Sequence, residues 1–433
     1  MKLSRRDLFK SASIAGGALA AGALGTPLRA QRGATQEEEC APLPPAFDAL
    51  KPLGDRVKPI TVEEYHGRIA HAQELMGRGS NFDALYITPG TTLRYFTGIG
   101  WGLSERIVAL LIPRTGDPLI VCPAFEERRL REQLRWPLEV RAWQEDESPY
   151  ALAGNWLTER GIRSGRIGVE ETTRYVFFDG LREFAPKFEY GPADPVTHIC
   201  RSRKSAHELE LMRLACQATF DVYKAMFASL HEGMRQSEIG VMVGRGYERM
   251  GLSGDAFALF GPAAAFPHGT HEDRALREGD GVLIDDGCTV EGYQSDVTRT
   301  GVFGKPSAKL HRAFEVVRKA QDAALAAAVA GRLCGSVDDA ARKVVDDAGF
   351  GPNYKYFAHR LGHGIGMDGH EWPYLVRGNN TILEPGMTFS DEPGIYIVGE
   401  FGIRLEDDWV VTPSGGDMFT PQSPSLEQPF AKA

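Results

Sequence analysis

The chain has 433 residues, of which 42% are hydrophobic and 25% charged, and its formal net charge is −9 at pH 7. This length and apolar content are enough for two or three domains with buried cores. An acidic chain without a basic stripe does not neutralise phosphates, so we exclude nucleic acid as a partner.

The first 30 residues have the composition of an export signal. The segment SRRDLFK, from Ser4 to Lys10, closely matches a twin-arginine motif and precedes an Ala/Gly-rich run from Ala12 to Gly25. That run is too short and too rich in glycine to span a membrane stably. We expect a signal peptide at 1–30, export to the periplasm and no membrane span after processing. The alternative is an amphipathic or disordered N-terminus on a cytoplasmic protein.

Residues 31–58 are rich in proline and glutamate, and this composition predicts a linker. Alternating helix and strand patterns follow it. Residues 59–198 are predicted to form an α/β domain, a mixed sheet flanked by helices. Its expected strands are 83–88, 106–113, 118–123, 138–143 and 166–171, and its expected helices are 62–76, 124–135 and 150–160. The segment 192–205 is predicted as the domain boundary.

The remaining residues, 199–433, have a different pattern. Helices are predicted at 206–230, 237–250, 308–329 and 337–348, with strands between the two pairs. The six cysteines have no CxxC spacing, so they give no sign of a zinc ribbon or redox pair, and we assign no disulfide.

Five residues in the last third of the chain have the types and settings of ligands for two divalent metal ions. Two lie in LIDDGCTVEGYQSDVTRT, which predicts a β-hairpin, and the others lie in GHGIG, SDEPGIY and GIRLEDDWVV. They are Asp285, Asp296, His363, Glu392 and Glu406. Four converging carboxylates would repel one another without a cation. This donor set suits manganese, iron, cobalt or zinc, of which we expect manganese. Taken singly, each acidic residue is more often a solvated surface group, and a lone histidine is more often structural.

Taken together, these residues resemble the pita-bread metallopeptidase family of creatinase, aminopeptidase P and prolidase. The separations match: 11 residues from Asp285 to Asp296, 29 from His363 to Glu392 and 14 from Glu392 to Glu406. The resemblance also covers PHG at 267–269, HEWP at 370–373 and the segment 201–215, and it extends from about residue 60 to 415. It implies a creatinase-like α/β N-terminal domain, an α+β pita-bread catalytic domain and a homodimer.

The resemblance also implies a role for each site residue. His363 and Glu392 would bind one metal ion, Asp285 the other, and Asp296 and Glu406 both. Glu392 would accept the proton of the attacking water. Other residues would donate to the substrate or orient the ligands; these are His268, His370, Arg404 and Tyr396. As alternatives, each histidine is a capped turn residue, Arg404 a surface ion pair and Tyr396 a core aromatic.

Family members with an added N-terminal domain cleave the bond before proline, which makes the expected substrate a small peptide with proline at its second position. In prolidases an arginine that binds the dipeptide carboxylate typically stands at the position of Tyr374. A tyrosine hydroxyl does not replace a guanidinium, so Xaa-Pro aminopeptidase and prolidase activities both remain open. Arg377 could compensate. Trp372 and Tyr374 would pack on the proline ring, or be ordinary loop aromatics.

Two other functions fit the same fold. One is a non-peptidase C–N hydrolase or organophosphate hydrolase, and the other is a pita-bread binding module without catalysis. Creatinase lacks the metal ligands, whereas this chain has all five, and intact ligands with an export signal disfavour a binding module.

Overall fold

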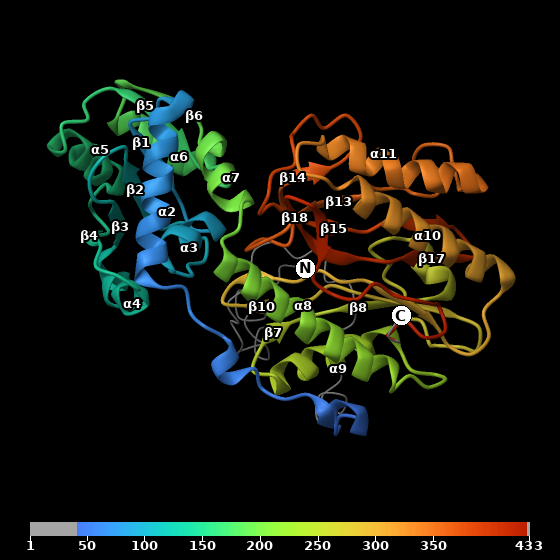
Figure 1. The fold of residues 1–433 in the computed structure, drawn as a ribbon. Helices are drawn as coiled ribbons and strands as arrows, with labels where there is room; N and C mark the ends of the chain where they lie inside the picture. Colours follow the sequence, from blue (N-terminus) through green and yellow to red (C-terminus); the bar gives the residue numbers. More distant parts are fainter. Residues whose placement is uncertain (1–40, 431–433) are drawn as a thin grey trace, which may run out of the picture.

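The computed structural model describes residues 41–430, which form two domains side by side (Figure 1). The predicted signal peptide at 1–30, the first part of the predicted linker and Cys40 lie outside the described residues. Among the described helices, none is both long and apolar enough to cross a membrane. The five cysteines in the described part of the chain are free and buried.

The N-terminal domain contains a six-stranded mixed sheet in the order β4-β3-β2-β1-β5-β6. Its strands are β1 (Ala84–Ile87), β2 (Ala109–Pro113), β3 (Leu119–Pro123), β4 (Glu139–Trp143), β5 (Gly165–Val169) and β6 (Phe188–Pro192). Its helices are α2 (Val62–Leu75), α3 (Thr91–Thr97), α4 (Glu127–Gln133), α5 (Pro149–Glu159), α6 (Tyr175–Phe184) and α7 (Asp194–Ser202). Helices cover both faces of this sheet, so β1, β2 and β3 are buried throughout, which explains their unbroken apolar runs.

The sequence analysis did not predict α3, α6 or β6 of this domain, and the predicted boundary segment forms a helix. The helices α3 and α6 and the strand β6 have weak patterns: α3 has seven residues, and α6 contains Gly180. That glycine lets the Tyr150 ring approach, since a Cβ there would lie 2.5 Å from it. The segment 192–205 contains α7, where Pro195 stands in the first helical turn, a position in which proline is tolerated.

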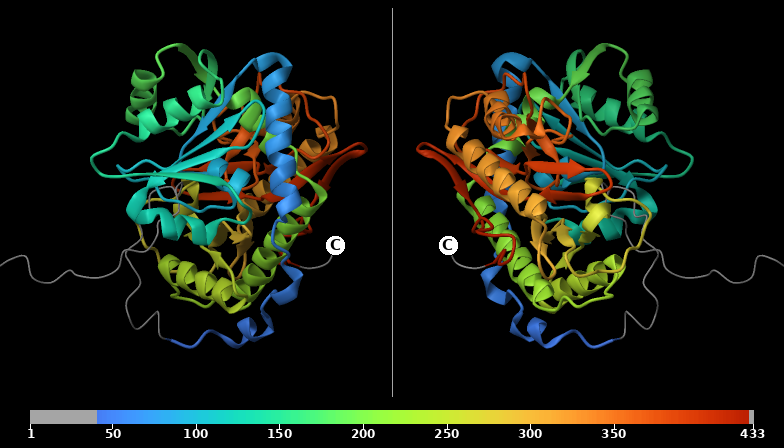
Figure 2. Two further views of the ribbon diagram at one scale, coloured as in Figure 1. Left: turned by 90° about the vertical axis from the view of Figure 1, so that its left-hand side faces the viewer. Right: turned by 90° about the vertical axis from the view of Figure 1, so that its right-hand side faces the viewer.

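Residues 41–58 pack against the C-terminal domain, although their composition predicts a tether. Two short 3-10 turns, η2 (Pro45–Ala49) and η3 (Gly54–Arg56), shape the segment. Its apolar residues Phe47, Leu50 and Leu53 are at most 5% exposed and join the main core. Figure 2 shows this segment running along the helices α8 and α9. We call residues 41–58 the strap.

The C-terminal domain has a strand layer between two helix pairs (Figure 1). The pairs are α8 (Ala206–Phe227) with α9 (Gln236–Arg249), and α10 (Ala308–Ala327) with α11 (Cys334–Val345), close to their predicted bounds. A capping box begins α8: the Ser205 hydroxyl accepts from the Glu208 amide, and the Ser205 amide donates to the Glu208 carboxylate.

The strands between these pairs form four small antiparallel sheets. They are β12-β9-β8, β11-β10-β7, β14-β13-β15-β18-β19 and β16-β17, with the bounds β7 (Ser253–Gly254), β8 (Phe257–Phe260), β9 (Gly281–Asp285), β10 (Cys288–Val290), β11 (Tyr293–Gln294), β12 (Arg299–Val302), β13 (Gly362–Gly364), β14 (Glu371–Leu375), β15 (Thr388–Asp391), β16 (Gly394–Ile397), β17 (Phe401–Arg404), β18 (Asp407–Thr412) and β19 (Gly415–Met418). The predicted hairpin is thus divided: β9 pairs with β12, while its tip, β10 and β11, pairs in another sheet.

Candidate metal centre and active site

The five predicted metal ligands meet within the strand layer. Asp285 ends β9, Asp296 lies between β11 and β12, His363 is in β13, Glu392 follows β15, and Glu406 precedes β18. Donor atoms of His363, Glu392 and Glu406 lie within 4.8 Å of one another, as do those of Asp285, Asp296 and Glu406. Because the two groups share Glu406, all five side chains form one cluster.

The tautomer of His363 directs one ring nitrogen at the cluster. Its Nδ1 lies 3.1 Å from the Gly364 carbonyl oxygen, which can only accept, so the proton is on Nδ1. The lone pair of Nε2 then faces the Oε1 atom of Glu392 at 3.3 Å and the Oδ2 atom of Asp296 at 3.7 Å. Burial, and then His370, lower the pKa of His363, which keeps the ring neutral as a metal ligand requires.

Burial and mutual repulsion oppose the charged forms of the acidic ligands. Burial raises the pKa of Glu392 to about 8, with Arg404 opposing the rise and Asp285 adding to it. Burial, followed by neighbouring carboxylates, also raises the pKa values of Asp296 and Glu406. Cations among these groups would favour the ionised forms. Four carboxylates and one imidazole therefore fit two divalent ions in charge and in donor type.

Arg404 contacts the metal-ligand cluster through Asp285 and Thr298. Its guanidinium donates to the Oδ2 atom of Asp285, to the Thr298 hydroxyl at 2.9 Å and to the Tyr396 hydroxyl at 3.0 Å. Thr298 in turn contacts the carboxylates of Asp285 and Glu406. Arg404 is 2% exposed, so the alternative of a surface ion pair is excluded, and the side chain contacts both Asp285 and Tyr396.

Tyr396 also contacts His359, a residue that the sequence analysis did not single out. The Nδ1 atom of His359 donates to the Arg360 carbonyl at 2.8 Å, so its Nε2 atom accepts from the Tyr396 hydroxyl, also at 2.8 Å. Burial, and then Arg404, lower the pKa of His359 to about 3, so the ring is neutral. Its Nδ1 atom lies 3.7 Å from the Oε2 atom of Glu392.

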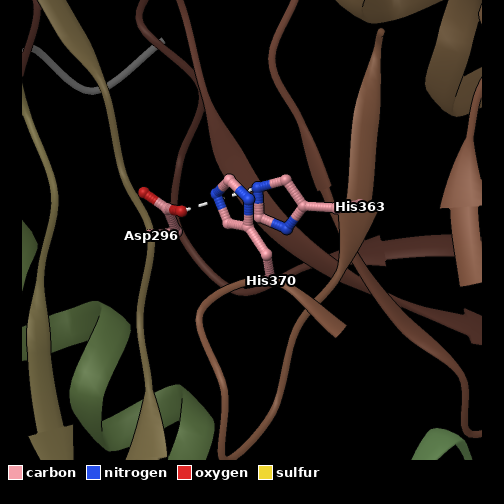
Figure 3. Close-up of side chains that lie close together, drawn as sticks. All are labelled: Asp296, His363 and His370. Atoms are coloured by element: carbon pink, nitrogen blue, oxygen red, sulfur yellow. Dashed lines mark ion pairs between the residues drawn. The ribbon is translucent and has the colours of Figure 1, made fainter. Parts of the chain in front are cut away.

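The two predicted donor histidines lie on the exposed side of the cluster. The His370 ring stacks on His363 with 3.7 Å between centroids, and Asp296 lies beside them (Figure 3). Arg360 donates to the Nδ1 atom of His370 at 3.3 Å, which leaves the proton on Nε2. Partial removal from water, and then Arg360, lower the pKa of His370 to about 4, so Nε2 is a neutral donor. His268 follows Pro267, whose carbonyl accepts from Arg404 at 3.1 Å.

The three predicted substrate residues have separate surroundings. The Trp372 ring stacks on His198 of α7, with 5.4 Å between centroids. Tyr374 lies under the guanidinium of Arg360, 4.2 Å from its ring centroid. Arg377 forms an exposed ion pair with Asp339 at 2.9 Å. Arg360 does lie at the site, and no carboxylate among the described residues pairs with it.

Sequence reasoning therefore missed Thr298, His359 and Arg360. Thr298 is two residues from Asp296 and starts no recognisable motif. His359 and Arg360 stand four and three residues before His363 in AHRLGHG, and this closeness to a ligand was the signal available.

Comparisons with known proteins agree with this geometry. Residues 210–413 match the model of metallopeptidase family M24, and residues 68–203 match the creatinase/prolidase N-terminal domain. The Xaa-Pro dipeptidase of Lactobacillus delbrueckii subsp. lactis is 34% identical over 80% of this chain and 95% of its own length. A prolidase from Thermococcus sibiricus has a TM-score of 0.76 at 31% identity, covering 82% of this chain and 97% of that one. A dipeptidase from Mycobacterium ulcerans has a TM-score of 0.79 at 34% identity, covering 86% and 99%. The predicted two-domain fold is confirmed.

Proposed function

This chain belongs to metallopeptidase family M24, and from that membership we propose that it hydrolyses the peptide bond preceding proline, using two divalent metal ions. The observation that carries the proposal is the single cluster of four carboxylates and one neutral imidazole. We propose Asp285, Asp296, His363, Glu392 and Glu406 as the ligands, and manganese as the metal.

The side chains around the cluster would each serve a step of peptide hydrolysis. Divalent ions bound here would lower the pKa of a water molecule and polarise the scissile carbonyl. Glu392 would accept the proton of the attacking water, since its carboxylate lies inside the cluster. His370 would donate from Nε2 to the oxyanion of the substrate, and His268 would assist from the same exposed side. Arg404, held by Tyr396, fixes the orientation of Asp285.

Arg360 supports dipeptides as substrates. The sequence alone left dipeptides and longer peptides open, because Tyr374 replaces an arginine. Arg360 comes from another segment to the same place, where its guanidinium lies over the Tyr374 ring and, among residues 41–430, forms no ion pair with a carboxylate. We propose that Arg360 binds the C-terminal carboxylate of an Xaa-Pro dipeptide, which agrees with the dipeptidase names of the relatives.

Elemental analysis and a peptide panel test this proposal. Protein purified without chelator should contain about two divalent ions per chain, and removing and restoring manganese should abolish and restore the hydrolysis of Xaa-Pro dipeptides. Xaa-Ala dipeptides and Xaa-Pro-Yaa tripeptides serve as comparisons. Full activity in metal-free protein would overturn the metal mechanism, and equal cleavage of Xaa-Ala would overturn the proline preference. Exclusive cleavage of longer peptides would instead favour an aminopeptidase.

A further inference from the structure

A partly buried charge cluster joins the two domains next to the candidate active site. Arg201 of α7 donates to the Oδ2 atom of Asp368 at 2.5 Å and to the Oε2 atom of Glu371 at 2.6 Å. Lys204 donates to the Oε1 atom of Glu371 at 2.6 Å. Thr91, at the start of α3 in the N-terminal domain, donates to the Oδ1 atom of Asp368. We call these five residues the junction cluster.

The charges of the junction cluster balance one another. Two cations face two carboxylates, and the side chains of Arg201, Lys204 and Glu371 are 8%, 2% and 7% exposed. Removing Glu371 would leave the buried Arg201 and Lys204 without the carboxylate they share, which is strongly unfavourable. The Asp368 side chain, in contrast, is 36% exposed. Arg201 extends the cluster into the N-terminal domain through the Thr92 hydroxyl, to which it donates at 3.2 Å.

The junction cluster contains Asp368 and Glu371, which lie on either side of His370 in the sequence and are bound by Arg201 and Lys204. The loop that carries His370, residues 365–370, connects β13 with β14, and so connects His363 to His370. Asp368 lies two residues before His370, and Glu371 follows it directly. Gly366 lets the loop backbone cross the cluster, because a Cβ there would lie 2.6 Å from the Glu371 carboxylate. The loop is also held by Gln294, whose backbone N–H donates to the Gly366 carbonyl at 2.7 Å and whose side-chain amide donates to the Met367 carbonyl at 3.1 Å.

The His370 side chain has few restraints of its own. Its ring is exposed and contacts His363 by stacking and Arg360 by one hydrogen bond. The place of its Nε2 atom therefore depends on the backbone of the loop. The Asp368 carboxylate, two residues before His370, accepts hydrogen bonds from Thr91 of the N-terminal domain and from Arg201 of α7, the helix that connects the two domains.

We propose that Asp368 and Thr91 are positioning residues for His370, so that turnover in the C-terminal domain depends on a hydroxyl supplied by the N-terminal domain. This inference rests on the proposed function, because His370 acts there on the substrate. It does not concern the metal ligands, so metal binding should be unaffected by changes at Asp368 or Thr91.

Kinetics of two variants and a matched control test the positioning role. Asp368→Asn removes the charge facing Arg201, Thr91→Val removes only a hydroxyl in the other domain, and Asp417→Asn removes an exposed carboxylate that pairs with Arg213 at the same kind of distance, 2.6 Å. We expect Asp368→Asn and Thr91→Val to lower kcat by about tenfold or more with a smaller change in KM, since displacements of about 1 Å cost up to a hundredfold. Asp417→Asn should match the unmodified enzyme.

A double-mutant cycle separates positioning from general support of the fold. In a His370→Ala background, Asp368→Asn should have no further effect on kcat, because the group through which it acts is gone. An unchanged effect in that background would overturn the proposal, as would a wild-type kcat in Thr91→Val.

A second readout does not depend on activity. The histidine ring signals of metal-free protein can be followed by NMR, and the His370 signal is the one missing from His370→Ala. It should shift in Asp368→Asn and Thr91→Val and stay in place in Asp417→Asn. An unmoved signal would refute the positioning role. A shifted signal in a protein that cleaves no Xaa-Pro peptide would instead show that the junction cluster positions His370 and that the proposed function is wrong.

Discussion

Replacing Arg360 with methionine tests whether this side chain reads the substrate carboxylate. Methionine keeps an unbranched apolar stem over the Tyr374 ring but removes the charge. A hydrogen bond to a charged group contributes about 1.5–3 kcal/mol, which corresponds to a loss of about tenfold to hundredfold in kcat/KM for an Xaa-Pro dipeptide. Arg360 is only partly buried, so we expect a value near the lower end.

Two controls isolate the carboxylate from other effects of Arg360. The corresponding Xaa-Pro amide has no C-terminal charge, so the variant should cleave it nearly as well as the unmodified enzyme does. Arg377→Met makes the same substitution at an arginine held by Asp339. Since such exposed pairs contribute ~0–1 kcal/mol to stability, dipeptide cleavage should be unchanged. Measuring kcat/KM for the unmodified enzyme and both variants, each with the dipeptide and its amide, gives the six values needed.

An equal loss on dipeptide and amide would refute this reasoning. Arg360 would then act through His370, whose Nδ1 atom it contacts, and not through the substrate. A larger loss in Arg377→Met than in Arg360→Met would return the role to the residue expected from the sequence.

Three further predictions concern the base, the fold and export. Glu392→Gln should lower kcat by about a hundredfold or more while circular dichroism stays unchanged, because a general base contributes about 10²–10⁴; activity within about tenfold of wild type would place the base elsewhere. Arg299→Met should lower the free energy of unfolding in urea by about 3–5 kcal/mol, since it leaves Asp407 unpaired where both side chains are 0% exposed; a loss under ~1 kcal/mol, the range of exposed pairs, would contradict this. Replacing Arg5 and Arg6 with lysines should retain the precursor in the cytoplasm, and periplasmic mature protein from that variant would exclude the twin-arginine signal.

The ligand cluster was predictable because its residues occur in short segments with fixed separations. Asp285 and Asp296 are close in sequence, and Glu392 and Glu406 each flank a strand. The long helices were also predictable, because their apolar periodicity extends over several turns. The predicted homodimer remains a prediction.

Arg360 was missed because its role depends on strand register. The strands β13 and β14 are antiparallel, with His363 paired to Tyr374 and Gly362 to Leu375. The residues before β13 therefore lie beyond Leu375, the last residue of β14. Arg360 thus lies beyond the strand end, and its guanidinium reaches back over the Tyr374 ring, whereas the Arg377 side chain is held by Asp339 of α11. A pattern of residue types does not encode this crossing.

The junction cluster was beyond sequence reasoning for a related cause. Arg201 and Asp368 are 167 residues apart, and each alone has the appearance of a solvated charge. Only the packing of α7 against the strand layer brings them together and buries Arg201, while Asp368 stays partly exposed.

The strap also limits how far the proposed export signal can stand from the folded enzyme. The first buried residue of the strap is Phe47, so residues 31–46 separate it in the sequence from a signal at 1–30. Sixteen residues reach at most about 58 Å when fully extended. A peptidase that removes the signal must therefore work within about that distance of the surface formed by the strap and the helices beneath it, and lengthening the 31–40 segment should make cleavage faster if this closeness limits its access.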